Sequence, residues 1–334
     1  MKKNIIISFM IISSMFISSV NFSQTKKDED TFNWNGYLQG RYSNNYNNIN
    51  SFSTRRAKFW ISGSMHKNWF YKVQSIYKDK NSGAFTLQDV KVGYKINSFK
   101  IIVGQMIPEY SLQRLQPDYA IPLVERASAI NSLIPSAETM ARDIGLQFIY
   151  QSSNKIFHSS LGLFNGNGAN KISNEDKNFL YTNKSYINIP IENTHLHIGY
   201  SVAYRKTTGL SFKKITGNSL LFSGDDFRWG TEARLYSDKW ELQGEYLEAH
   251  LGDNKSWGYY VLADYYITKE NLIAFSIEKY KNLLPTQDDD PWYIVSYAHK
   301  FDGDKIKLSF DNRIQTGDFD NNYSTTIQLQ YFFN

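Results

Sequence analysis

Apolar and polar residues alternate one by one along most of the chain beyond residue 33. In residues 195–205, the apolar side chains Leu196, Ile198 and Tyr200 fall on one face of an extended chain, with polar or small residues between them. Successive side chains of a β-strand point to opposite faces, so this period of two predicts a strand. The same alternation occurs in residues 227–236, 306–315 and 323–333. We predict an all-β chain with about 16 strand-like segments.

The segments are separated by short runs rich in Asn, Gly and Asp. Examples are residues 165–168, 224–226 and 302–304. These residue types tolerate or supply positive φ angles, and they favour turns between antiparallel strands. No sequence repeat or interdomain linker interrupts the pattern, so the strands are predicted to form one domain.

Composition changes the picture from a β-protein to a membrane β-protein. Aromatic residues make up 16% of the chain, yet the mean hydropathy is −0.48. That mean excludes a helical membrane protein. A transmembrane antiparallel β-barrel explains both values, because its outer face is apolar with aromatic girdles and its inner face is polar. A soluble exported β-protein is the alternative, since its strands would also alternate.

Several kinds of chemistry are excluded or weakly supported. The chain has no cysteine, which excludes disulfides, thiolate metal sites and a catalytic thiol. Its net charge of +5 without a basic block does not indicate a nucleic-acid partner. The glycine pair Gly166 and Gly168 lacks the rest of a phosphate-binding loop, and His195 and His197 lack a third metal ligand. We predict no catalytic residue, metal site or cofactor.

The first residues have the features of an export signal. Lys2 and Lys3 precede an apolar stretch of about a dozen residues, which is shorter than a spanning helix needs. We predict a signal peptide at 1–23, a short charged leader at 24–32 and a barrel at 33–334. The predicted location is the bacterial outer membrane.

Residues 108–140 break the alternation. They contain four of the seven prolines, with helix-like patterns at 111–116 and 123–133. Such an insertion suits a loop folded into the lumen of a barrel. A long external loop has the same pattern, and the pattern alone does not distinguish the two.

The order of short motifs resembles the phosphate-selective porin O and P family. The resemblance covers most of the chain beyond the leader, and its specific motifs lie in the first half. The motifs are Trp34-Asn35-Gly36-Tyr37-Leu38-Gln39, Arg55-Arg56-Ala57, Val103-Gly104-Gln105-Met106, Glu125-Arg126, Arg142-Asp143-Ile144-Gly145 and Leu161-Gly162-Leu163-Phe164-Asn165-Gly166.

The resemblance implies a 16-stranded outer-membrane porin, a homotrimer whose long third loop narrows the pore. The third loop corresponds to residues 108–140. It further implies contact with outer-membrane lipid and with the barrel-assembly machinery, which reads an aromatic residue near the end of the last strand; here Phe333 is next to last. Residues 108–140 carry four acidic and two basic side chains, a net charge of −2, so phosphate is not carried over as the substrate.

Charged residues on the predicted inner face are candidates for lining the pore or setting its selectivity. We favour a solvated wall with internal ion pairs over a selectivity filter. Arg126, Arg142 and Asp143 match family motifs near the loop ends, and we expect them to fix the loop to the wall. The candidates are Arg56, Lys58, Arg114, Glu125, Arg126, Arg142, Asp143, Arg205, Arg228, Glu232, Arg234 and Arg313.

These observations favour an outer-membrane porin for passive diffusion of small polar or anionic solutes, with phosphate as one candidate. Two alternatives keep the barrel but change its function. One is a barrel enzyme acting on lipids, for which no residue spacing selects a catalytic triad. The other is a plugged structural or adhesive barrel.

Overall fold

The computed structural model describes residues 30–333, except 78–83, 172, 175, 285–289 and 318–320. The predicted signal peptide and most of the predicted leader lie outside the described residues. Within them, sixteen strands and a few short helices form the fold. The strands are β1 Asn33–Asn44, β2 Asn50–Met65, β3 Trp69–Tyr77, β4 Phe85–Ile96, β5 Phe99–Met106, β6 Asp143–Gln151, β7 Phe157–Phe164, β8 Leu180–Ile191, β9 Thr194–Ser211, β10 Leu221–Tyr236, β11 Trp240–Leu251, β12 Asn254–Tyr266, β13 Asn271–Lys281, β14 Trp292–Phe301, β15 Ile306–Thr316 and β16 Asn321–Phe333. The helices are α2 Leu112–Leu115, α3 Ser128–Leu133, α4 Lys213–Thr216 and the 3₁₀ turn η1 Ala137–Thr139.

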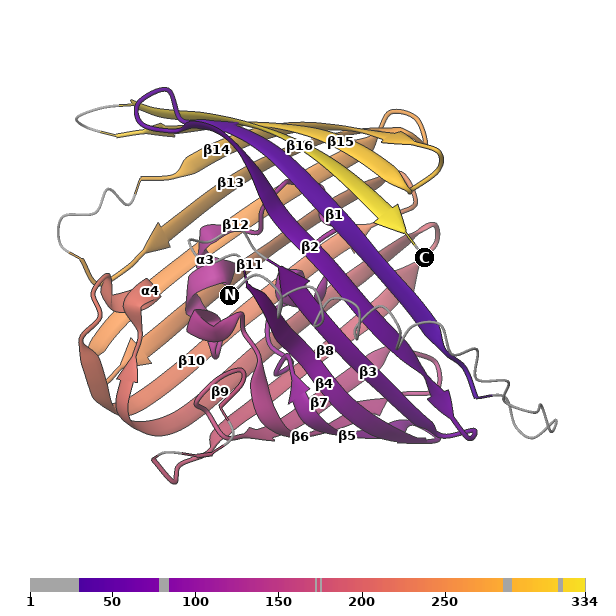
Figure 1. Cartoon of the computed structure of the whole chain (residues 1–334), viewed down its shortest axis with the longest axis vertical. Helices are drawn as coiled ribbons and strands as arrows, with labels where there is room; N and C mark the ends of the chain where they lie inside the picture. The colour runs from indigo at the N-terminus through magenta and orange to yellow at the C-terminus, as the bar shows by residue number, and fades with distance from the viewer. Residues whose placement is uncertain are drawn as a thin grey trace, which may run out of the picture.

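The strands close into a barrel. Each strand pairs antiparallel with its sequence neighbours, and β1 pairs with β16 to complete the ring (Figure 1). Gly36 lies opposite Phe333, and Asn44 lies opposite Thr325. Closure satisfies the backbone hydrogen bonds that an open sheet edge would leave unpaired, which is a requirement inside a lipid bilayer. The predicted all-β antiparallel barrel of about 16 strands is confirmed.

The barrel is polar inside and apolar outside. On β9, the outward side chains Ile198 and Tyr200 are 48% and 46% exposed, whereas the inward Ser201 and Arg205 are 1% and 5% exposed. The buried face of the sheet is therefore its polar face, the reverse of a soluble sandwich. The alternation predicted for residues 195–205 is confirmed.

The connections differ in length at the two ends of the barrel. Turns of two to five residues lie at the end of the barrel where β1 begins and β16 ends, and the predicted turn at 302–304 is one of them, with positive φ at Asp302 and Gly303. The opposite end carries the longer loops. The turn predicted at 224–226 is wrong, because these residues lie inside β10. Gly224, Asp225 and Asp226 pair in regular register with residues 207–205 of β9, and the β-bulge next to them inserts its extra residue on β9, at residues 208–209.

The third loop at the opposite end, residues 107–142, folds into the lumen. It connects β5 to β6 and contains α2, α3 and η1, and Figure 1 shows α3 inside the ring of strands. The helix predicted at 123–133 is shorter than expected, because α3 begins only at Ser128. The residues before Ser128 are not helical, and the Val124 N–H donates a hydrogen bond to Asp311 on β15 at 2.9 Å.

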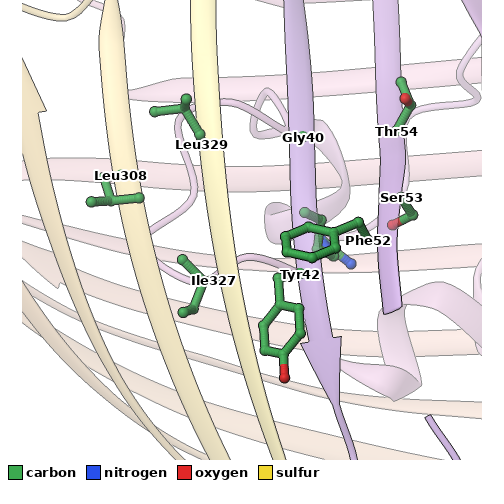
Figure 2. A pocket seen from close by; sticks show the side chains of 9 residues that line it. Gly40, Tyr42, Phe52, Ser53, Thr54, Leu308, Ile327 and Leu329 are labelled. Carbon is green, nitrogen blue, oxygen red and sulfur yellow. The ribbon is translucent and has the colours of Figure 1, made fainter. Parts of the chain in front are cut away.

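In the described ranges, helices are too short and too polar to cross a bilayer. A separate hollow of about 580 Å³ lies on the outer face of the barrel, across the seam where β1 meets β16. Figure 2 shows apolar side chains from β1, β2, β15 and β16 around Gly40, which has no side chain to fill the space. This hollow faces away from the lumen.

Candidate functional site

The lumen loop is fixed to the wall on the β11–β13 side by backbone and apolar contacts. The N–H groups of Leu112 and Gln113 donate to the Glu245 carboxylate at 2.9 and 2.7 Å, and the Tyr260 hydroxyl donates to the same carboxylate at 2.8 Å. The first turn of α2 would otherwise leave these amide donors without an acceptor. One buried wall carboxylate therefore holds the start of the loop.

Helix α3 packs against the same side of the barrel. Ala129, Ile130 and Leu133 are fully buried there, within a cluster of apolar wall residues from β11, β12 and β13. Burial of a side chain such as Ile or Leu stabilises by about 1.5–3 kcal/mol. Gly258 permits the close approach, since a Cβ at this position would lie 2.7 Å from the Ala129 Cβ.

The acidic side chains of the loop meet basic side chains of the wall. Glu125 pairs with Arg41 at 2.8 Å, with Arg56 at 2.9 Å and with Arg55. Asp118 pairs with Lys58 at 2.6 Å and with Arg126 of the loop itself. The loop's net charge of −2 is therefore neutralised by the barrel wall.

These ion pairs change the pKa values of the two loop carboxyls, Asp118 and Glu125. Burial alone would raise the pKa of both carboxyls, but the neighbouring cations outweigh burial. Lys58 and Arg126 hold the pKa of Asp118 well below its ordinary value, and Arg56 and Arg55 do the same for Glu125. Both carboxyls are ionised at neutral pH.

A cavity of about 220 Å³ remains between the loop and the wall on the β1–β4 side. Five basic side chains and two acidic ones line it, a balance of +3. They are Lys58, Lys72, Arg114, Arg126 and Arg142 against Asp89 and Asp118.

The ion pairs in this cavity leave one cation without a carboxylate. Asp89 pairs with Arg142 at 3.1 Å and with Lys72 at 3.4 Å, while Asp118 pairs with Lys58 and Arg126. Arg114 donates to the Met140 carbonyl, and its Nε has no hydrogen-bond partner among the described residues. Burial, together with the charges of Arg142 and Arg126, lowers the pKa of Arg114. An anion in the cavity would relieve this unfavourable environment.

The structure brings some of the sequence-predicted candidates together here. Lys58, Arg114, Arg126 and Arg142 line the cavity, and Arg56 and Glu125 pair beside it. Arg142, at the end of the loop, pairs with Asp89 on β4 at 3.1 Å. Arg126 differs from the prediction, because its guanidinium donates to the loop's own carbonyls at Gln113 and Gln116 and so shapes the loop itself.

Asp143 links two loops. Its carboxylate accepts hydrogen bonds from the Ser136 hydroxyl at 2.7 Å and from the N–H groups of Gly166 and Gly168 at 3.2 Å each. It therefore joins the end of the lumen loop to the residues that follow β7.

The remaining candidates form separate clusters on the wall. Asp226 binds Arg205 at 2.9 Å and Arg228 at 2.7 Å, and Arg228 also donates to the carbonyls of Leu133 and Ile134 at the end of α3. The other clusters are Glu232 with Lys184 and His197, Arg234 with Glu241, and Arg313 with Glu278.

Sequence reasoning missed several residues of the site. Lys72 and Arg41 were not candidates, although each shares its strand's inward face with a glutamine, Gln74 and Gln39. That inward alternation was the available signal. Trp60 had the same signal, because it alternates inward with Lys58, but aromatic residues were expected on the outer face; Tyr119, in the loop, had no such signal.

The geometry defines a class of protein: a β-barrel channel whose third loop narrows a water-accessible lumen. The sequence model of the family "phosphate-selective porin O and P" matches residues 33–288, and the chain belongs to this family. The protein is an outer-membrane porin, a channel rather than an enzyme acting on lipids.

Solved structures share the fold at low sequence identity. Salmonella typhi OmpF, in complex with daunomycin, is 11% identical with a TM-score of 0.68, covering 91% of this chain and 98% of that one. Vibrio cholerae OmpT in its trimer form is 11% identical with a TM-score of 0.61, covering 92% and 100%. A mutant of Rh. blastica porin is 11% identical with a TM-score of 0.60, covering 91% and 100%. The comparison with curated protein sequences gives no match.

Proposed function

We propose that this porin conducts small anions in preference to cations, through the basic cavity between the lumen loop and the β1–β4 wall. The observation that carries the proposal is the +3 balance of the cavity lining. A narrow passage whose lining carries an excess of one sign of charge concentrates counter-ions and favours their passage. Inorganic phosphate is one solute of this kind.

A second cavity supports the same direction. About 290 Å³ of space lies beside η1, lined by Lys171, Arg205 and Arg228 against Glu138; Asp226 pairs with both arginines, so three basic and two acidic groups leave a balance of +1. Anions approaching the constriction from this side meet a basic lining before they reach the lumen loop.

The test is the reversal potential of the refolded protein in a planar bilayer under a KCl gradient. The proposal expects a potential of the sign that chloride permeation gives, and a chloride conductance that falls when phosphate is added. A cation-selective channel, or one without preference, would overturn it.

We also propose that the porin is a homotrimer in contact with outer-membrane lipid. The trimer form of the structurally similar Vibrio cholerae OmpT and the apolar outer face of the barrel support this. Cross-linking in detergent followed by mass measurement should give three copies, and a monomer at all protein concentrations would contradict it.

Export and assembly complete the proposal. Residues 1–23 would direct export and be removed, and the barrel-assembly machinery would insert the barrel from residue 33 onward. The N-terminal sequence of the mature protein from the outer-membrane fraction should begin near residue 24, and a retained N-terminus would contradict the proposed cleavage.

A further inference from the structure

An aromatic cluster lies inside the lumen, where a porin wall is ordinarily polar. Trp60 of β2 and Tyr119 of the lumen loop stack with ring planes 4° apart and centroids 6.3 Å apart. Phe332 of β16 contacts both rings edge-on, at 5.8 Å from Trp60 and 5.2 Å from Tyr119. Tyr37 of β1 completes the cluster.

The cluster lines the same cavity as the basic side chains. Trp60, Tyr119 and Tyr37 belong to the lining of the 220 Å³ cavity, together with the apolar Ile107 and Leu115. The Lys72 Nζ lies 5.6 Å from the centroid of the Trp60 ring. Cations and aromatic faces are therefore within one small solute's length of each other.

Packing within the cluster leaves part of the ring surface exposed. Tyr37 is fully buried and serves as a structural support, whereas Trp60, Tyr119 and Phe332 keep part of their surface exposed. Trp60 shares the inward face of β2 with Arg56 and Lys58, so its exposed surface faces the lumen and not the lipid. A flat apolar group entering the cavity would cover this surface.

We propose that the preferred solutes are organic anions that combine a carboxylate with a planar ring, of which benzoate is the simplest probe. The proposal rests on the anion preference above and specifies its substrate class. The carboxylate would accept a hydrogen bond from Lys72 and lie beside the positive charge of Arg114, and the ring would lie against Trp60 and Tyr119. The cavity equals the liquid volume of about seven water molecules, which suits one ring and excludes large fused systems.

The experiment compares block of the chloride current by benzoate and by acetate, two monovalent carboxylates that differ in the ring. Stacking of aromatic groups contributes enough to give about a tenfold difference. We expect benzoate to reach half-block at about one tenth of the acetate concentration in the native channel. Trp60→Leu should bring the two concentrations close together, and Trp60→Phe, which keeps a ring, should retain most of the difference.

The matched control is Trp229→Leu, the same change on the outward face of β10. It should retain the full benzoate preference. Tyr119→Leu, in the loop, provides a second test in case Trp60→Leu does not insert correctly, and it should also reduce the preference. Only variants with the native circular dichroism spectrum are compared.

The outcomes separate this inference from the function on which it rests. Equal block by benzoate and acetate in an anion-selective native channel overturns the inference and leaves the proposed function standing. A benzoate preference that survives both Trp60→Leu and Tyr119→Leu also overturns it, because the ring site then lies elsewhere. A channel without anion preference overturns the proposed function itself.

Discussion

The two sides of the lumen loop differ in how they meet the barrel. On the β11–β13 side, apolar side chains of α3 and the backbone N–H groups of α2 contact the wall closely, and Gly258 removes even a methyl group from the interface. On the β1–β4 side, contact is made by long charged side chains, and a cavity of about 220 Å³ remains between them. The first side positions the loop, and the second leaves space for a solute.

This difference explains how an acidic loop can border a basic passage. The loop carboxylates Glu125 and Asp118 are occupied by wall cations, so their charge is cancelled where they touch the wall. Arg114, from the same loop, pairs with no carboxylate in the described part of the chain and lines the cavity. Net charge summed along the loop therefore differs in sign from the charge that a solute meets.

The largest expected effect comes from breaking the charged contacts at Glu125. Glu125→Gln leaves Arg41, Arg55 and Arg56 without their shared carboxylate, and removing one partner of a buried ion pair costs about 3 kcal/mol. Amide hydrogen exchange of residues 107–142, followed by mass spectrometry, should accelerate by about a hundredfold. Glu192→Gln in the exposed turn after β8 is the control, and equal exchange rates in the two variants would contradict the assignment.

Breaking the close packing on the other side should have a smaller effect. Gly258→Val places a side chain against Ala129 of α3, and overpacking of this kind costs about 1–3 kcal/mol. We expect a displaced loop and a larger, noisier single-channel conductance. Gly40→Val adds the same side chain on the outer face, where a Cβ has no atom within 4 Å, and its conductance should match that of the native channel.

Lowering the pH should have the smallest effect of the three changes, because the two loop carboxyls stay ionised well below neutral pH. The pKa values of Asp118 and Glu125 are depressed in the folded protein, so their contribution to stability is complete above the unfolded value of about 4 and is lost as pH falls through the folded values. The side-chain carboxyl 13C chemical shifts of Asp118 and Glu125 should be steady from pH 7 to pH 5 and change only below about 4. Titration of either carboxyl near pH 6 would contradict this.

Much of the fold could be predicted because the alternation of polar and apolar residues within one strand shows which side chains face the lumen. Alternation in residues 195–205 predicted both the strand and its two faces, and the prolines of residues 108–140 marked a long insertion without showing whether it lies inside or outside the barrel. The continuation of β10 through residues 224–226 could not be predicted, because a Gly-Asp-Asp run favours a turn in isolation and only pairing with β9 keeps it extended.

The site was less predictable for a physical reason. Phe332 and Tyr37 are neighbours only because β16 pairs with β1, and the register of that closing pair is a property of the whole ring. The partners of Glu125 come from β1 and β2 and depend on how far the loop reaches across the lumen. Alternation predicts which face of the strand a side chain occupies. It does not predict how far along the barrel axis that side chain contacts the loop.

The most direct test of the account is the reversal potential of Arg114→Met under a KCl gradient, compared with the native channel and with Lys206→Met. Both variants lose one positive charge, but Arg114 lines the cavity whereas Lys206 is exposed on the outer face of β9. The account predicts an anion-selective native channel, a clear shift toward cations in Arg114→Met and no shift in Lys206→Met. Equal reversal potentials in all three proteins would contradict the claim that this cavity sets the selectivity of the pore.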